Sequence, residues 1–196
     1  MGTKERILFN ALELFSKSGY NAISIRDIAR SVNIKESSIY YHFDNKQDIL
    51  NSIVERYEFH IKELLDILDK AIEKTDNANL LSFDVMKNYF FEQYLFDPFC
   101  NRMMRFMLLE QFHNKMIQTL YNKYLFELPE KIQMHTLRLM CKKGFISECD
   151  VVKTGRIFFS MVTSLTFRYL LNGELTDAKK EAFCKDIFFL FDSFEG

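Results

Sequence analysis

Apolar positions near the start of the chain recur with the period of an α-helix. The apolar face of this first predicted helix is formed by Ile7, Leu8, Ala11, Leu12 and Phe15. Gly19 follows them, at a point where a left-handed glycine commonly ends a helix. A second helix is predicted after the cap Ser24, with an apolar face formed by Ile25, Ile28, Ala29 and Val32. Asn33 then tolerates the left-handed conformation of a tight turn.

A third helix, barely two turns long, is predicted within "KESSIYYHFDNK", residues 35–46. A helix this short does not persist alone in water, so we expect Ile39 and Phe43 to dock it onto the preceding helices. Docking through this pair turns outward the polar and aromatic side chains Ser37, Ser38, Tyr41 and His42. Such a face can donate and accept hydrogen bonds, which favours contact with a polar partner.

The remaining pattern predicts longer helices. One helix is expected from Lys46 to roughly Lys74, followed by a polar loop over residues 74–79. Further helices are predicted near residues 80–95, 98–125, 129–143, 149–172 and 177–195. A content of only 6 Gly and 2 Pro also favours an all-α fold. We expect about nine helices in two domains, residues 1–48 and 49–196, joined by the long helix.

Charge and composition exclude only a few classes of function. The formal net charge is -1, and residues 1–50 hold seven positive and six negative side chains. Nucleic-acid binding would therefore depend on a few placed cations rather than on bulk charge. The 4 Cys are scattered, so neither a disulfide framework nor a metal site is predicted, and no cofactor is expected. Neither a signal peptide nor a membrane span is predicted, which favours a cytoplasmic protein.

Several motifs occur together over roughly residues 4–50. They are A-x-x-L-F-x-x-x-G-Y from Ala11, I-A at Ile28, I-Y-x-H-F from Ile39 and N-K-x-x-I-L from Asn45. With these motifs, the first part of the chain resembles the DNA-binding domain of the TetR family of bacterial transcriptional regulators. Because so many positions match at the family's spacing, the signal is far more specific than a lone short motif. The resemblance implies a helix-turn-helix whose third helix enters the major groove.

The resemblance also implies residue roles. Base edges would be approached by Arg26, Glu36, Ser37, Ser38, Tyr41 and His42. Phosphates would be contacted by Ser24, Tyr40 and Lys46. Lys35 stands where the family commonly has a small hydroxyl cap, so it is expected to reach a phosphate instead. Plainer alternatives remain open, with Arg26 and His42 as solvated surface and Tyr40 packed against a neighbouring helix.

The family resemblance implies a homodimer formed by the last two helices and an effector cavity among the central ones. Apolar stripes fit the first role, and the predicted interface comprises Phe158, Val162, Leu165, Tyr169, Phe183, Ile187, Phe188, Phe191 and Phe194. The predicted cavity comprises Phe90, Tyr94, Met103, Phe106, Met107 and Phe159, with Glu110, His113 or Arg102 orienting a polar group. Core packing is the alternative for each cavity residue.

These features favour a homodimeric repressor on an inverted-repeat DNA operator, released by an apolar or aromatic small molecule. The alternative is a ligand-independent architectural or protein-interaction protein bound to DNA. An enzyme is not predicted, because the sequence has no H-E-x-x-H, no G-x-S-x-G and no phosphate-binding glycine loop.

Overall fold

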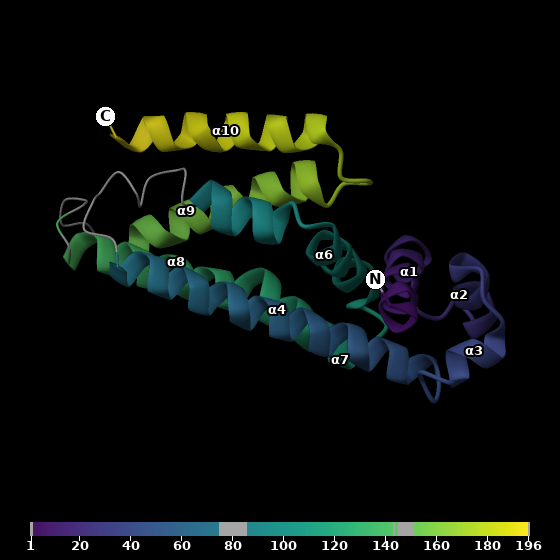
Figure 1. Ribbon diagram of the computed structural model, residues 1–196. Helices are drawn as coiled ribbons and strands as arrows, with labels where there is room; N and C mark the ends of the chain where they lie inside the picture. The colour runs from purple at the N-terminus through teal and green to yellow at the C-terminus, as the bar shows by residue number, and fades with distance from the viewer. Residues whose placement is uncertain (1, 75–85, 143, 145–150, 196) are drawn as a thin grey trace. The chain divides into compact units, whose positions relative to one another are not determined.

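The computed structural model describes residues 2–74, 86–142, 144 and 151–195, and these residues form helices and no strand. The α-helices are α1 (Thr3–Ser18), α2 (Ile25–Val32), α3 (Glu36–Tyr40), α4 (Lys46–Lys74), α6 (Pro98–Glu110), α7 (Lys115–Asn122), α8 (Leu128–Lys142), α9 (Val151–Leu165) and α10 (Asp177–Glu195) (Figure 1). Three π-helical segments are η2 (Met86–Leu95), η3 (Lys123–Glu127) and η4 (Thr166–Leu170). The all-α prediction is confirmed.

The chain packs as two compact units. The first comprises Met1–Glu63 and Arg102–Leu120, and the second comprises Leu64–Asn101 and Tyr121–Gly196. The first unit therefore includes the start of α4 and most of α6 in addition to α1–α3. The functional division between residues 48 and 49 stays a prediction, whereas the packing of the first unit extends beyond it.

Helices α1, α2 and α3 pack together in the first unit (Figure 1). Phe15, Ile28 and Ile39 are fully buried there, and Phe43 is nearly so. Burial of Ile39 and Phe43 confirms that this pair docks the third helix. A helix of five residues is not stable alone in water, so the position of α3 depends on the packing of Ile39 and Phe43.

The two predicted turn residues both have positive φ. Asn33 adopts the left-handed conformation at φ 59° and ψ 48°, and its N–H donates to the carbonyls at the end of α2. Gly19 follows α1 at φ 81° and ψ 159°, an extended geometry that glycine tolerates and other residues rarely adopt. Glycine therefore ends α1 as predicted, but in a different conformation from the predicted left-handed cap.

The helix predicted over residues 98–125 is interrupted. It ends at Glu110, and α7 begins at Lys115. Asn114 causes the restart, because its Oδ1 accepts hydrogen bonds from the amides of Met116 and Ile117 at 3.0 and 3.2 Å. This is the contact by which asparagine caps a new helix.

The helix predicted over residues 129–143 corresponds to α8, which begins at Leu128. Segment η3 follows α7 directly and passes into α8 one residue before the proline. Pro129 has no N–H to donate to the carbonyl four residues earlier, and the N–H of Leu128 reaches back five residues to the carbonyl of Lys123. Pro129 therefore lies in the first turn of α8, where a missing N–H is tolerated.

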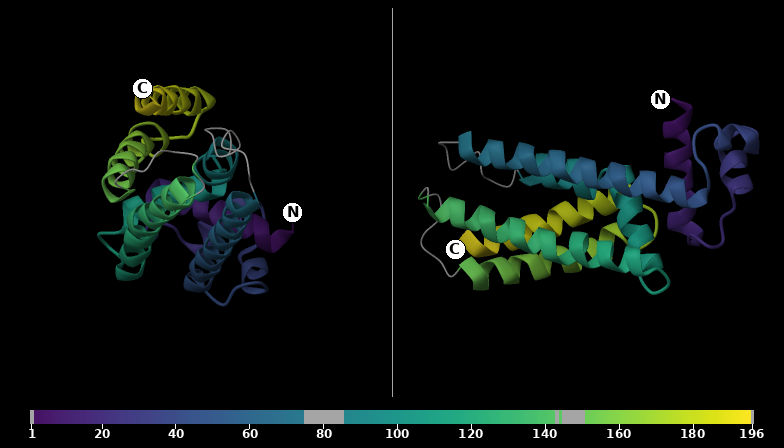
Figure 2. Two further views of the ribbon diagram at one scale, coloured as in Figure 1. Left: turned by 90° about the vertical axis from the view of Figure 1, so that its left-hand side faces the viewer. Right: turned by 90° about the horizontal axis from the view of Figure 1, so that it is seen from below.

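The second unit contains a close helix pair. Helices α8 and α9 lie alongside each other (Figure 2). A Cβ at Gly155 would lie 3.3 Å from Met134 Cγ and 3.4 Å from Leu137 Cδ1, so the glycine permits this approach. Helix α10 packs on α9 and η4, where Phe183 is fully buried. Its ring meets that of Phe91 edge-on at 5.1 Å.

Within the described part of the chain, every helix is either too short or too polar to serve as a membrane span.

Candidate nucleic-acid interface

Helix α2 begins in a reciprocal cap. The Ser24 hydroxyl accepts a hydrogen bond from the Asp27 amide at 3.2 Å, and the Ser24 amide donates to Asp27 Oδ2 at 3.0 Å. The hydroxyl also donates to the same carboxylate at 2.5 Å. These bonds from Ser24 hold the pKa of Asp27 below its ordinary value. The cap fixes the first turn of α2, which carries Arg26 with its side chain 74% exposed.

Removal of this cap gives a first prediction. Ser24→Ala should lower the free energy of unfolding by about 1 kcal/mol, because the Asp27 amide loses its acceptor and the Asp27 carboxylate loses the hydrogen bond from the hydroxyl. Chemical denaturation without DNA measures the change. Ser18→Ala, at the exposed end of α1, is the matched control and should stay within about 0.5 kcal/mol of the parent. Equal effects of the two substitutions would contradict the assigned role of the cap.

Helix α3 presents an aromatic and polar surface. Its cap position is Lys35, which has extended backbone but no capping hydrogen bond from its side chain, as predicted. Glu36, Ser37 and Tyr40 are exposed, while Ser38 and His42 are half-buried. Tyr41 directly follows the helix and is 86% exposed. The structure thus brings the predicted base-contacting residues of this segment to one end of the first unit.

A salt bridge joins α2 to α3. Arg26 Nε lies 3.6 Å from Glu36 Oε1, and both side chains are mostly exposed. Such a pair contributes little to stability. In this structure the pair places the Arg26 guanidinium beside the first residue of α3.

Lys46, which is predicted to contact a DNA phosphate, binds backbone carbonyls of its own chain. Its ammonium donates to the carbonyls of Tyr20 and Ile23 at 2.9 and 2.8 Å, and lies 4.1 Å from the centre of the Tyr20 ring. Burial lowers the pKa of Lys46, and the negative charge of Glu110 opposes that shift. An ammonium has three donors, so the predicted phosphate contact depends on the one that these carbonyls leave.

The predicted effector residues do not form one cluster within either unit. Met103, Phe106 and Met107 are fully buried in the first unit, where Phe106 lies 5.9 Å from Phe15, ring centre to ring centre. Tyr94 is buried in the second unit together with the half-buried Phe90 and Phe159.

The polar members of that set have other partners. Glu110 accepts a hydrogen bond from the Tyr20 amide at 2.8 Å, and Arg102 lies 3.4 Å from Glu13. His113 is exposed. In this structure Glu110 and Arg102 attach α6 to α1 and to the loop that follows it, and their part in a ligand site stays a prediction. Local sequence patterns gave no sign of these pairings, which join residues about ninety positions apart.

Part of the predicted dimer interface is internal core. Val162, Phe183 and Ile187 are buried by their own chain, so a partner cannot reach them. Phe158, Leu165 and Tyr169 are half-buried, and Phe188 is 58% exposed. Phe191 and Phe194 lie outside the described side chains. Phe189, absent from the prediction, is 69% exposed.

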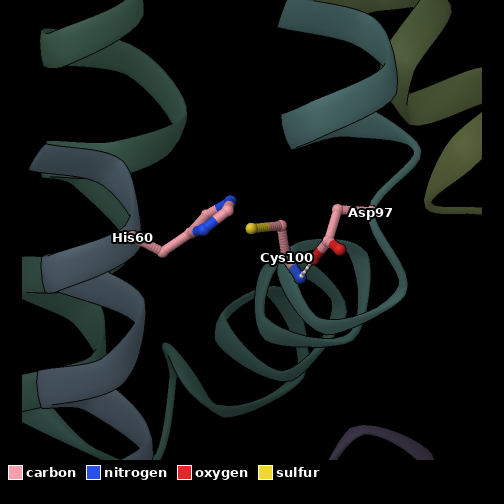
Figure 3. A group of neighbouring side chains, drawn as sticks. All are labelled: His60, Asp97 and Cys100. Carbon is pink, nitrogen blue, oxygen red and sulfur yellow. Dashed lines mark hydrogen bonds between the residues drawn. The ribbon is translucent and has the colours of Figure 1, made fainter. Parts of the chain in front are cut away.

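Asp97 caps α6 in the second unit. Its Oδ1 accepts a hydrogen bond from the Cys100 amide at 2.8 Å (Figure 3). Burial raises the pKa of the Cys100 thiol. His60, also drawn in Figure 3, belongs to the first unit. Among the described residues, neither unit by itself gathers three candidate metal ligands.

A capped helix followed by a tight turn and a short exposed helix is the geometry of a helix-turn-helix DNA-binding protein. The sequence model described as "Bacterial regulatory proteins, tetR family" matches residues 7–53. The amino-terminal domain of the chain is therefore a DNA-binding domain of the TetR family type.

Known proteins resemble the chain to different extents. The biofilm operon icaADBC negative transcriptional regulator IcaR of Staphylococcus aureus (strain Newman) is 40% identical over 94 residues, 48% of this chain. That match spans only 46% of the relative's length.

Solved structures share the fold over nearly the whole chain. A transcriptional regulator from Aquifex aeolicus VF5 has a TM-score of 0.65 at 22% identity, covering 96% of this chain and 99% of its own. A protein from Saccharomonospora viridis, solved in complex with choline, has a TM-score of 0.62 at 22% identity and covers 94% of both chains.

Proposed function

We propose that this protein is a sequence-specific DNA-binding repressor of transcription. The observation that carries the proposal is the surface around α3, where Tyr41 is 86% exposed on a segment docked by the buried Ile39 and Phe43. An aromatic side chain held this far into solvent by a fixed short helix is suited to the major groove. The negative regulator IcaR, similar over the matched 94 residues, supports repression as the sign of regulation.

Within this proposal, the residues divide by role. Arg26 makes a guanine-type contact, and Ser37, Ser38 and Tyr41 contact base edges or thymine methyl groups. Glu36 and His42 complete the surface that reads bases. Phosphate contacts from Ser24, Lys35, Tyr40 and Lys46 set the register on the duplex.

The proposed assembly is a homodimer on an inverted repeat. Two recognition helices about 34 Å apart would meet successive major grooves. Exposed apolar side chains on the last two long helices support a contact between two copies. They are Val152 and Ile157 on α9, and Phe188 and Phe189 on α10.

A charge placed on α10 tests the dimer. Phe188→Asp should weaken dimerisation at least tenfold, because an exposed phenyl group proposed to be buried by the partner becomes a carboxylate. Light scattering over a concentration series measures the dimer fraction. Phe112→Asp is the control, since Phe112 is exposed in the first unit and has no proposed place in the interface. A dimer unaffected by Phe188→Asp would exclude this face.

The proposed effector is an apolar or aromatic small molecule that favours a different spacing of the two recognition helices. The 21 Phe and 9 Met of the chain support an apolar lining. The choline-bound protein of the same fold supports a small-molecule site, although choline itself is a cation. A ligand-independent DNA-bound protein is the alternative. A ligand that raises the melting temperature of the protein and lowers its operator affinity would favour the effector-regulated repressor over the ligand-independent protein.

Footprinting tests the proposal as a whole. The purified protein should protect a short inverted repeat in the DNA upstream of its own gene, with two copies of the chain per site. Protection without an inverted repeat would contradict the symmetric dimer. Absence of any protected site in that region, and in a library of random duplexes, would contradict sequence-specific binding.

A further inference from the structure

The loop between α1 and α2, residues 19–24, is held by charged side chains from two later helices. Glu110, the last residue of α6, accepts a hydrogen bond from the Tyr20 amide at 2.8 Å and is only 5% exposed. Lys46, the first residue of α4, donates to the carbonyls of Tyr20 and Ile23. All of these residues belong to the first unit. The loop backbone thus donates one hydrogen bond to a carboxylate and accepts two from an ammonium group.

Gly19 makes the approach of the carboxylate possible. A Cβ at this position would lie 2.7 Å from Glu110 Oε1, a distance that real Cβ atoms do not tolerate. The φ of 81° independently disfavours any other residue there. Glycine at the end of α1 therefore does more than stop the helix, because it leaves room for an acid from α6 to reach the Tyr20 amide.

The held loop leads directly into the DNA-facing residues. Ile23, whose carbonyl Lys46 binds, precedes Ser24, the cap of α2. Arg26 lies two residues further on. Hydrogen bonds in which one partner is charged are shorter and stronger than neutral ones, so both contacts restrain the loop firmly. The direction from which α2 begins, and hence the place of Arg26, follows from that restraint.

We infer that Glu110 is a positioning residue for DNA recognition: it holds the α1–α2 loop in the conformation from which Ser24 and Arg26 meet the operator. The inference rests on the proposed DNA-binding function and extends it to a residue outside the helix-turn-helix. It also identifies one contact between α6 and that motif, the hydrogen bond from the Tyr20 amide to the Glu110 carboxylate.

Operator binding by Glu110 variants tests the inference. Glu110→Ala should bind the operator about tenfold more weakly, the change expected when a base-contacting side chain is displaced. Binding to a non-operator duplex should weaken less, by about twofold, because phosphate contacts dominate it and Ser24 is only one of the proposed phosphate contacts. Glu110→Gln keeps an acceptor oxygen for the Tyr20 amide and should recover most of the operator affinity. Glu127→Ala, which removes an exposed acid in the second unit, is the charge control.

A purely structural role predicts a different pattern, in which operator and non-operator binding fall together in proportion to the unfolded fraction. That pattern, or operator affinity unchanged in Glu110→Ala, would overturn the inference. Failure of the parent protein to prefer any operator would instead overturn the proposed function.

Hydrogen exchange provides a measurement that needs no folded alanine variant. The Tyr20 amide should exchange slowly in the parent protein and at least tenfold faster in Glu110→Gln, whose neutral oxygen is a weaker acceptor. Exchange of this amide at the rate of an exposed loop amide in the parent protein would overturn the inference.

Discussion

Replacing Phe15 with alanine is expected to lower the free energy of unfolding by about 3–5 kcal/mol. Phe15 is fully buried in the first unit, and its ring centre lies 5.2 Å from that of Tyr20 and 5.9 Å from that of Phe106. Truncation removes apolar contacts to α6 as well as to the α1–α2 loop and leaves a cavity between them. Urea denaturation followed by circular dichroism measures the loss.

The chain offers a matched control for this substitution. Phe112 belongs to the same unit but is 80% exposed, so Phe112→Ala should change stability by no more than about 0.5 kcal/mol. A small effect at Phe15, or equal effects at both positions, would contradict the packing described for α1 and α6.

Tyr41→Ala is expected to reduce operator affinity tenfold to a hundredfold, equivalent to about 1–3 kcal/mol, with little effect on stability. Stability should be unaffected because the side chain is 86% exposed. Fluorescence anisotropy with a labelled operator at fixed salt measures the affinity. Loss of stability without loss of affinity would contradict a DNA-reading role.

Tyr40 is the matched comparison for Tyr41. It is the neighbouring tyrosine, 55% exposed, and its proposed contact is a phosphate. Tyr40→Ala should therefore weaken binding to all sequences by a similar factor, whereas Tyr41→Ala should relax the preference at a particular base pair. Uniform weakening by both variants would remove Tyr41 from the residues that set sequence preference.

The first three helices could be predicted from the sequence because their signals are local. Helical spacing placed Phe15 and Ile28 inside, and the need to dock a two-turn helix identified Ile39 and Phe43. Asn33 was identified by its tolerance of the left-handed conformation that it adopts.

Longer-range features had no such local signal. The hydrogen bond from Tyr20 to Glu110 joins segments 90 positions apart, so spacing along one helix could not indicate it. The carboxylate was therefore predicted to face an effector. Lys46 was predicted to face phosphate for a similar reason, although two carbonyls of the α1–α2 loop bind its ammonium.

An apolar stripe on a helix also does not indicate which residues cover it in the folded protein. Phe183 and Phe188 both lie on α10, and the sequence assigned both to a dimer interface. The structure buries Phe183 within its own chain and leaves Phe188 exposed. An amphipathic pattern records that a face is covered, but it is the same whether the covering residues come from the same chain or from a partner.

The most direct test of the central claim is equilibrium binding to the DNA just upstream of the protein's own gene, at one stated salt concentration. The parent protein and an Arg26→Ala/Tyr41→Ala double variant would be compared, with non-operator duplex as competitor. Sequence-specific recognition predicts saturable binding of the parent to a short inverted repeat and loss of that binding in the double variant. Weak binding that is independent of sequence and equal for both proteins would contradict it.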